Sequence, residues 1–136
     1  MTDLLAQLPG YALRRAANAV MGELAPILAG HDLKIAEAAV LLLVREQANL
    51  TSSQIGKTLD IQRANMVPLL NRLESAGLIH REPIDKKSLA INLTKDGEAK
   101  ICEAGAAIDT FEKNLLARVP AEHRDHLLPA LNAIWR

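Results

Sequence analysis

Three polar residues near the middle of the chain have side chains that can read base edges in the DNA major groove. They are Gln62, Arg63 and Asn65. Arginine can donate two hydrogen bonds to guanine, and asparagine or glutamine can pair with adenine in the same bidentate way. Further along the chain, Lys86 and Lys87 offer two adjacent positive charges that could meet phosphate groups. These residues predict contact with DNA, provided that the fold places them on one face.

Each of these residues also has a purely structural interpretation. The three polar residues could be solvated side chains on the surface of a helix. The two lysines could be ordinary turn residues, or charges that keep a strand edge from pairing with another chain. A further basic residue, Arg72, could reach phosphate or form an ion pair with Asp85. The elements that hold these side chains therefore decide between the interpretations.

Hydrophobic periodicity predicts those elements. Apolar residues recur at three-to-four spacing in several stretches, and these predict helices over residues 11–29, 33–47, 52–59, 63–76, 96–118 and a last one after Pro120. The run Thr51-Ser52-Ser53-Gln54 has the form of a capping box for the third helix. Gly77 is placed to end the fourth helix. Pro68 lies inside that helix and predicts a local bend or a late start, because it removes a backbone donor.

The hydrophobic period changes to two over residues 78–93. Residues 78–82 and 89–93 are each predicted as a strand, and the polar turn between them carries the two lysines. Residues 33–93 then form a winged helix-turn-helix core, whose second helix can enter the major groove while the hairpin reaches the neighbouring backbone. The expected fold class is mainly α with a small two-stranded β-hairpin, flanked by N- and C-terminal helices.

Length and charge limit the classes of protein that fit. The 136 residues are 49% hydrophobic and suit one domain over residues 1–136. Sixteen basic residues balance sixteen acidic ones, so binding to nucleic acid would need a local patch. Residues 54–87 hold six basic and four acidic residues. The longest uncharged apolar run, Ala38–Val44, is far short of the roughly 20 residues of a membrane span. With no basic-then-apolar leader, we expect a soluble cytoplasmic protein without a membrane partner.

Residue patterns for catalysis or metal binding are missing from the sequence. It has no Ser/His/Asp or Cys/His pairing, glycine-rich phosphate loop or multi-cysteine site, so we expect no enzyme, metal or cofactor. Cys102 could be an oxidisable thiol, but its place beside Ile101 in a helix favours buried packing. His123 and His126 could share a metal ion, but without a third ligand they are better explained as a solvated surface pair.

Three sequence runs occur in order and at characteristic distances. They are Asn71–Arg81, Asp85-Lys86-Lys87 and Leu93–Gly97. With these runs, almost the whole chain resembles the MarR family of bacterial transcription regulators. The hairpin of that family commonly ends in an arginine that enters the minor groove. Lys87 stands at that position, and lysine lacks the planar fork, so we expect a less specific contact there. Pro68 is a second departure from the family pattern.

The resemblance implies a homodimer that binds a pseudo-palindromic operator as double-stranded DNA. The helices of residues 1–32 and 94–136 would build the dimer. Their apolar seams support this independently, because the small core cannot cover all of that surface. Such proteins usually act as repressors. The expected DNA-binding residues are Thr51, Ser52, Gln62, Arg63, Asn65, Arg72, Lys86 and Lys87.

The resemblance also implies a small-molecule effector, often aromatic or anionic, or release from DNA by oxidation. His31 would lie at the edge of the effector cleft, and Tyr11 and Arg15 are further candidates for ligand binding. The alternative function is a winged-helix module that binds protein and not DNA. Salt dependence separates the two, because only binding to phosphates releases many counterions.

Overall fold

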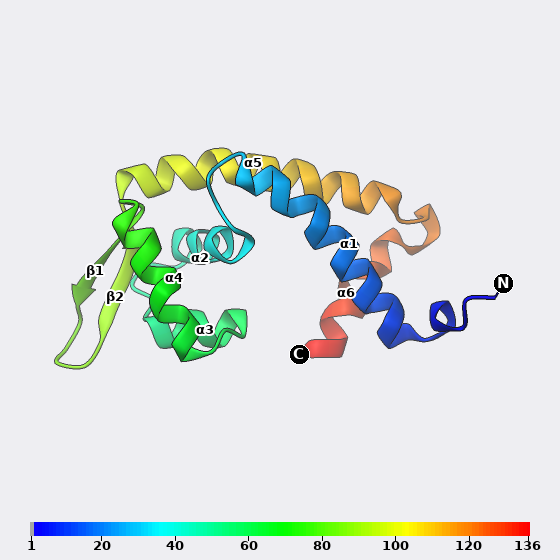
Figure 1. Cartoon of the computed structure of the whole chain (residues 1–136), viewed down its shortest axis with the longest axis horizontal. Helices are drawn as coiled ribbons and strands as arrows, with labels where there is room; N and C mark the ends of the chain where they lie inside the picture. The colour runs from blue at the N-terminus through cyan, green and yellow to red at the C-terminus, as the bar shows by residue number, and fades with distance from the viewer. Residues whose placement is uncertain (1) are drawn as a thin grey trace.

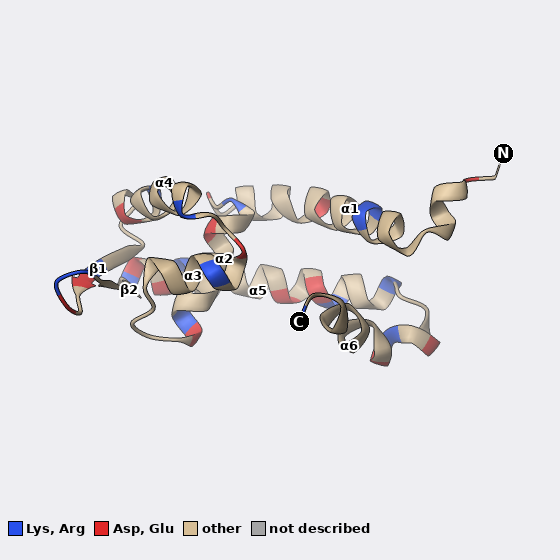
Figure 2. Ribbon diagram, turned by 90° about the horizontal axis from the view of Figure 1, so that it is seen from below, with Lys and Arg blue, Asp and Glu red and all other residues tan. Residues whose placement is uncertain are grey.

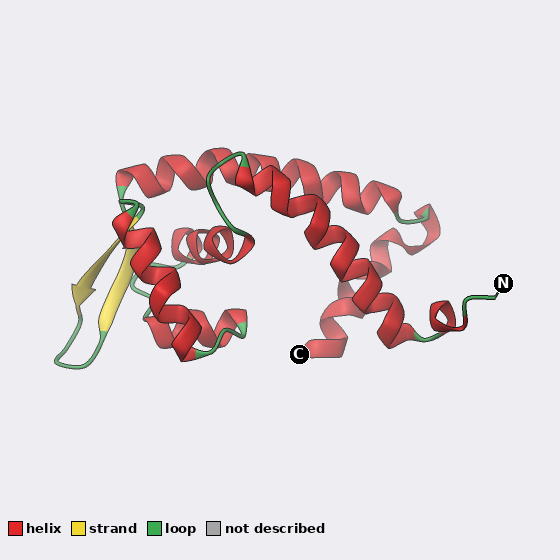
Figure 3. Ribbon diagram, in the orientation of Figure 1, coloured by secondary structure: helices red, strands yellow, loops and turns green. Residues whose placement is uncertain are grey.

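One long helix, α5 (Lys95–Arg118), runs along the molecule and joins its two ends (Figure 1). The computed structural model describes residues 2–136. One end holds α2 (Ile35–Glu46), α3 (Ser52–Leu59), α4 (Arg63–Ser75) and a hairpin of β1 (Ile79–Pro83) and β2 (Leu89–Leu93). Helix α1 (Pro9–Ala29) crosses α5 and leads to the other end, which holds η1 (Leu4–Gln7), η2 (Ala121–His123) and α6 (Arg124–Trp135). The fold class is as predicted, mainly helical with one two-stranded hairpin (Figure 3).

Local signals in the sequence set the starts and ends of the central helices. Thr51 caps α3 through the predicted capping box: the Gln54 backbone N–H donates to Thr51 Oγ1 at 3.2 Å, and the Thr51 N–H donates to Gln54 Oε1 at 2.9 Å. Gly77 follows α4 with a φ of 75°, a left-handed conformation that glycine adopts without steric cost. The ends of these helices and of the two strands fall within two residues of the predicted positions.

The hairpin is anchored to the connection between α2 and α3. Its antiparallel register places Ile79 opposite Leu93. The Ile91 N–H donates to the Leu50 carbonyl at 2.8 Å, which adds a short bridge beside β2. The Asn92 side chain also exchanges two hydrogen bonds of 3.0 Å with Asn49. These bonds fix the base of the hairpin, whereas its tip extends away from the helices (Figure 1).

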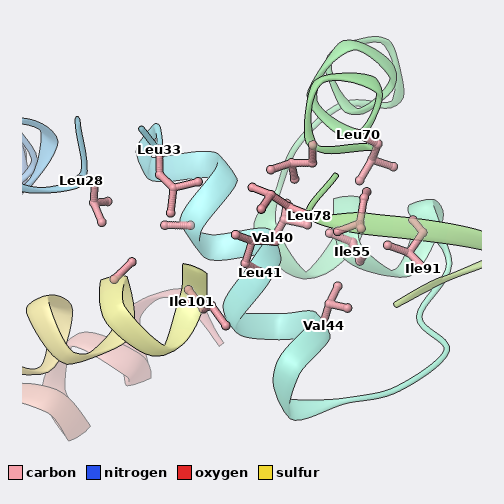
Figure 4. Packing of buried hydrophobic residues seen from close by; sticks show 14 of the residues in the cluster. Leu28, Leu33, Val40, Leu41, Val44, Ile55, Leu70, Leu78, Ile91 and Ile101 are labelled. Carbon is pink, nitrogen blue, oxygen red and sulfur yellow. The ribbon is translucent and has the colours of Figure 1, made fainter. Parts of the chain in front are cut away.

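The core is aliphatic and lies at the hairpin end of the molecule. Figure 4 shows Val40 and Leu41 of α2 among side chains from α3, α4, β2 and α5. Phe111 is the one aromatic residue in this core. Because strands, helices and loops all contribute to one cluster, the hairpin and α4 are held in fixed positions relative to α5.

Three details differ from the sequence prediction. Helix α4 begins at Arg63, as its period predicts, with Pro68 inside it, so of the two effects expected of the proline the late start is not found. The last helix does not begin near Pro120, because the 3₁₀ turn η2 comes first and α6 begins at Arg124. Cys102 is exposed and not buried, because α5 turns Ile101 and Ala104 into the core and Cys102 outward.

Among residues 2–136, none of the helices combines the length and hydropathy needed to span a bilayer.

Candidate nucleic-acid interface

An open groove of about 590 Å³ lies between α3, the first turns of α4 and the hairpin. Its basic lining residues are Lys57, Arg63, Arg81 and Lys87, and within the described chain no aspartate or glutamate lines it. Its other polar lining residues are Thr51, Ser52, Ser53 and Ser88. A groove with basic and hydroxyl side chains and no acidic ones matches the chemistry of a phosphate backbone.

The turn between α3 and α4 fixes how α4 is presented. Asp60 ends α3 in a left-handed conformation with a φ of 54°, and the Ile61 N–H donates to the Gly56 carbonyl at 2.8 Å. A Cβ atom on Gly56 would lie 3.0 Å from the Ile61 carbonyl oxygen and 3.1 Å from Met66 Cγ. The two helices therefore pack as closely as a glycine allows, which holds α4 rigidly against α3.

The predicted base-reading residues lie at the start of α4. Gln62 is the N-cap and Arg63 the first helical residue, and both side chains are exposed. Asn65 is exposed one residue before Met66, which is buried. Of these three polar residues, Arg63 lines the groove. Helix residues placed this way can enter a major groove first, as the N-terminal residues of recognition helices do.

The start of α3 brings two more predicted residues to the groove. Thr51 and Ser52 both line it and are half-buried. Thr51 Oγ1 accepts the capping hydrogen bond, which leaves its hydroxyl hydrogen available to donate. The positive end of the α3 dipole favours an anion at this position.

The tip of the hairpin carries the two predicted lysines. Lys86 and Lys87 are exposed, and Figure 2 shows basic residues at the tip next to acidic ones. Asp85 shapes the turn: its Oδ1 accepts from the backbone N–H groups of Lys87 at 2.7 Å and Ser88 at 2.8 Å. Lys87 points to the groove side and lines it, whereas Lys86 does not.

Arg72 has a different partner from the one predicted. Its Nε lies 2.9 Å from Glu37 Oε2 in α2, and Asp85 is occupied with the hairpin turn. Glu37 is only 2% exposed, and its other oxygen accepts from the Lys34 backbone N–H at 2.7 Å. Arg72 does not line the groove. The side chain therefore ties α4 to the start of α2.

Among the groove residues that sequence reasoning did not assign to the site are Lys57, Val67 and Arg81. Lys57 lies four residues after Ser53 on α3, so helical spacing could have placed it on the same face. Arg81 is held by Asn71 and Glu74, whose carboxylate lies 3.3 Å from Arg81 Nε. That position depends on contacts between β1 and α4, which no local pattern reveals.

Of the three predicted ligand-binding residues, Tyr11 and Arg15 lie about one turn apart near the start of α1, whereas His31 lies beyond its other end. Tyr11 lines a shallow pocket of about 310 Å³ near the start of α1, and Arg15 forms an ion pair of 2.6 Å with Asp3. His31 follows the other end of α1, and its carbonyl accepts from Lys100 Nζ at 3.1 Å. At 1.5 Å per residue, the helix separates Tyr11 from His31 by roughly 30 Å. A single chain therefore does not bring them into one cleft.

The two histidines of the last helix region do not form a metal site with other residues. His123 and His126 are exposed. Among residues 2–136, no group of three or more His, Cys, Asp or Glu side chains could hold a metal ion.

Comparison with known proteins identifies the family. A family model described as "MarR family" matches residues 31–87. The transcriptional repressor CouR bound to a 23-mer DNA duplex is 34% identical, with a TM-score of 0.90 over 99% of this chain and 100% of that chain. CouR bound to p-coumaroyl-CoA is 33% identical, with a TM-score of 0.88 over 100% of this chain and 97% of that chain. The homoprotocatechuate degradative operon repressor of Escherichia coli is 29% identical over 118 residues, which are 85% of this chain and 80% of that protein. The chain belongs to the MarR family of transcription regulators.

Proposed function

We propose that this chain is a cytoplasmic, homodimeric repressor that binds a pseudo-palindromic operator and leaves it when a small aromatic ligand binds. The observation that carries the proposal is the basic groove without acidic lining residues between α3, α4 and the hairpin. Its support from relatives is the 34% identical repressor CouR, which is bound to a DNA duplex and shares the fold over the whole chain.

The side chains around the groove divide the work of binding. Lys57, Lys86 and Lys87 neutralise phosphates and supply most of the affinity, which is sensitive to salt. Gln62, Arg63 and Asn65 enter the major groove and supply the choice of sequence. Thr51 and Ser52 bind one phosphate at the start of α3 and fix the register of the protein on the duplex.

The proposed partner in the dimer is a second copy of the chain. The end of the molecule away from the groove exposes large apolar side chains on α1, α5 and α6, among them Leu13, Leu116, Leu128, Ile134 and Trp135. Helix α6 has no buried residue of its own. Exposed large apolar side chains on neighbouring helices favour a protein interface. A dimer built there leaves both copies of α4 free to reach half-sites about 34–36 Å apart.

The proposed effector is an aromatic acid or its coenzyme A thioester. The support comes from relatives: CouR is bound to p-coumaroyl-CoA, and the Escherichia coli relative is named for homoprotocatechuate degradation. In the dimer the ligand would bind between the core and the dimerisation helices and change the separation of the two α4 helices. His31, Tyr11 and Arg15 remain candidates for its contacts, with Tyr11 and Arg15 contributed from a different copy than His31, because α1 separates them within one chain.

Selection from a randomised duplex pool, combined with sedimentation, tests this proposal. We expect a dimer in solution and enrichment of an inverted repeat. Addition of p-coumaroyl-CoA should release the enriched duplex, whereas coenzyme A alone should not. A monomer that enriches no sequence would contradict the proposal and support a protein-binding module instead. A dimer that keeps its duplex in the presence of p-coumaroyl-CoA and of salicylate would contradict the effector class only.

A further inference from the structure

The outer face of the first half of α4 is apolar where a solvated helix would be polar, whereas Asn71 and Ser75 continue the same side as exposed polar residues. Met66, Leu70 and Leu73 are buried on its inner face. With 3.6 residues per turn, Ala64 and Pro68 project from the opposite side, and both are exposed. This outer face therefore packs against nothing within residues 2–136.

Val67 extends the apolar surface to the groove. It is 52% exposed and lines the groove beside Arg63. Between Asn65 and Asn71 the helix has no polar side chain at all. We name Ala64, Val67 and Pro68 the apolar strip of α4. The apolar strip follows Gln62 and Arg63 along α4, and its residues are exposed as those two are.

We propose that the apolar strip determines operator specificity by packing against the 5-methyl groups of thymines. This inference rests on the proposed function, because it requires α4 to lie in the major groove. The thymine methyl is the one apolar group that a base pair presents there, and small apolar side chains are its partners. Ala64, Val67 and Pro68 are such side chains.

The basic lining of the groove favours DNA as the partner of the apolar strip. The basic residues Lys57, Arg63 and Lys87 line the same groove as Val67, and no acidic residue of the described chain lines it. An apolar protein partner would not need three cations around it, whereas a duplex offers phosphates beside its base edges. The strip is also small: an alanine and a proline ring let the helix backbone approach base edges closely.

Replacement of thymine by deoxyuridine tests the inference, because it removes only the methyl group. The probe is the half-site that the wild-type chain enriches from a randomised pool, with each thymine replaced in turn. We expect one or more replacements to weaken binding about fourfold per contacted methyl, from the free energy of burying one such group. Replacement outside the half-site should have no effect.

Two variants assign the effect to the strip. For Val67→Ala and Pro68→Ala, the ratio of affinities for thymine and deoxyuridine should fall towards one at a sensitive position. The matched control is Pro129→Ala, which removes an exposed proline inside α6 and should keep the wild-type ratio. Because the ratio is measured within one protein, changes in stability or dimerisation do not imitate the effect.

Three results would overturn the inference while the proposed function stands. One is an enriched half-site without thymine, and another is equal affinity for every thymine and deoxyuridine duplex. The third is a wild-type ratio retained by both strip variants, since other residues would then contact the methyl groups. If one variant does not fold, the other still gives the ratio, and the single-site deoxyuridine series on the wild-type chain decides the first two results without either variant. Enrichment of no sequence would refute the proposed function itself.

Discussion

The basic residues near the groove carry the same charge, but some of them have an ion-pair partner within the protein and others do not. Arg63 and Lys87 have no ion-pair partner within residues 2–136, so both are available to a ligand. Arg72 and Arg81 already bind Glu37 and Glu74 within the protein. The positions of Arg63 and Lys87 were predictable from the sequence, because one stands at the start of a helix and the other in a turn. It could not predict that Arg72 meets Glu37, because that contact depends on how α4 packs against α2.

Replacing Arg63 and Lys87 should have different effects on DNA binding. Arg63→Ala should cost roughly 1–3 kcal/mol on the enriched duplex and little on random DNA, because it removes a base contact. Lys87→Ala should weaken binding to both duplexes and lower the salt slope by about 1, because it removes a phosphate contact. Anisotropy titrations of each variant on both duplexes make the comparison. Equal losses on both duplexes for Arg63→Ala would contradict the assignment of that residue to base edges.

Arg72 should act on stability and not on phosphate binding. Arg72→Ala leaves the Glu37 carboxylate buried without its ion-pair partner. We expect a loss of about 1–2 kcal/mol in the free energy of unfolding, reduced by the partial exposure of Arg72. Urea unfolding measures it. The double variant Arg72→Ala with Glu37→Gln should lose less than the sum of the single variants, because the lone charge is gone. A lower salt slope for DNA binding in Arg72→Ala would show that the residue reaches phosphate after all.

Elements were predictable from the sequence where a local signal defined them. The capping box at Thr51, the glycine after α4 and the change of period at the hairpin all set boundaries within two residues. The features that the sequence did not predict are either very short or depend on tertiary contacts. The 3₁₀ helices η1 and η2 have only four and three residues, too few for a hydrophobic period. The exposure of Cys102 follows from the exact rotation of α5 against the core.

The junction between the hairpin and α5 should be the element contact least tolerant of an added methyl group. A Cβ atom on Gly97 would clash with the carbonyl oxygen of Leu78, so the first turn of α5 would have to move away from the residue that leads into β1. We expect Gly97→Ala to lower the free energy of unfolding by about 1–3 kcal/mol.

The matched control for that change is Gly22→Ala in α1. A Cβ atom there would meet nothing within 4 Å, so the variant should be at least as stable as the wild type. Urea denaturation of both variants provides the test. Wild-type stability for Gly97→Ala would mean that α5 does not approach the hairpin as closely as described.

The whole molecule has its basic groove at one end, whereas α6, with exposed Leu128, Ile134 and Trp135, and the first half of α1, with exposed Leu13, lie at the other end (Figure 1). Helix α5 spans the distance between them, so a change in packing at the apolar end could tilt the groove end. The sequence predicted this division through its apolar flanking helices. The predicted helix over residues 11–29 already placed Tyr11 and His31 at its opposite ends, but the length of a helix does not say which residues a second copy would bring together.

Charges placed in the apolar end should separate the copies. Leu128→Glu and Ile134→Glu add a carboxylate at side chains that are 65% and 66% exposed in one chain. If a second copy covers them, burying an unpaired charge opposes association, and both variants should sediment as monomers with weakened binding to the inverted repeat. Lys86→Glu is the reciprocal control, since it should weaken DNA binding while the dimer persists. Unchanged sedimentation of both apolar-end variants would place the dimer interface elsewhere.

The most direct test of the central claim is the salt dependence of binding to DNA from upstream of the chain's own gene. Fluorescence anisotropy would follow that duplex and a scrambled duplex of equal length across a salt series. We predict tighter binding to the upstream duplex at every salt concentration and a steep loss of affinity with salt on both, because phosphate contacts release counterions. Absence of binding to either duplex at low salt would contradict the account and assign α4 to a protein partner.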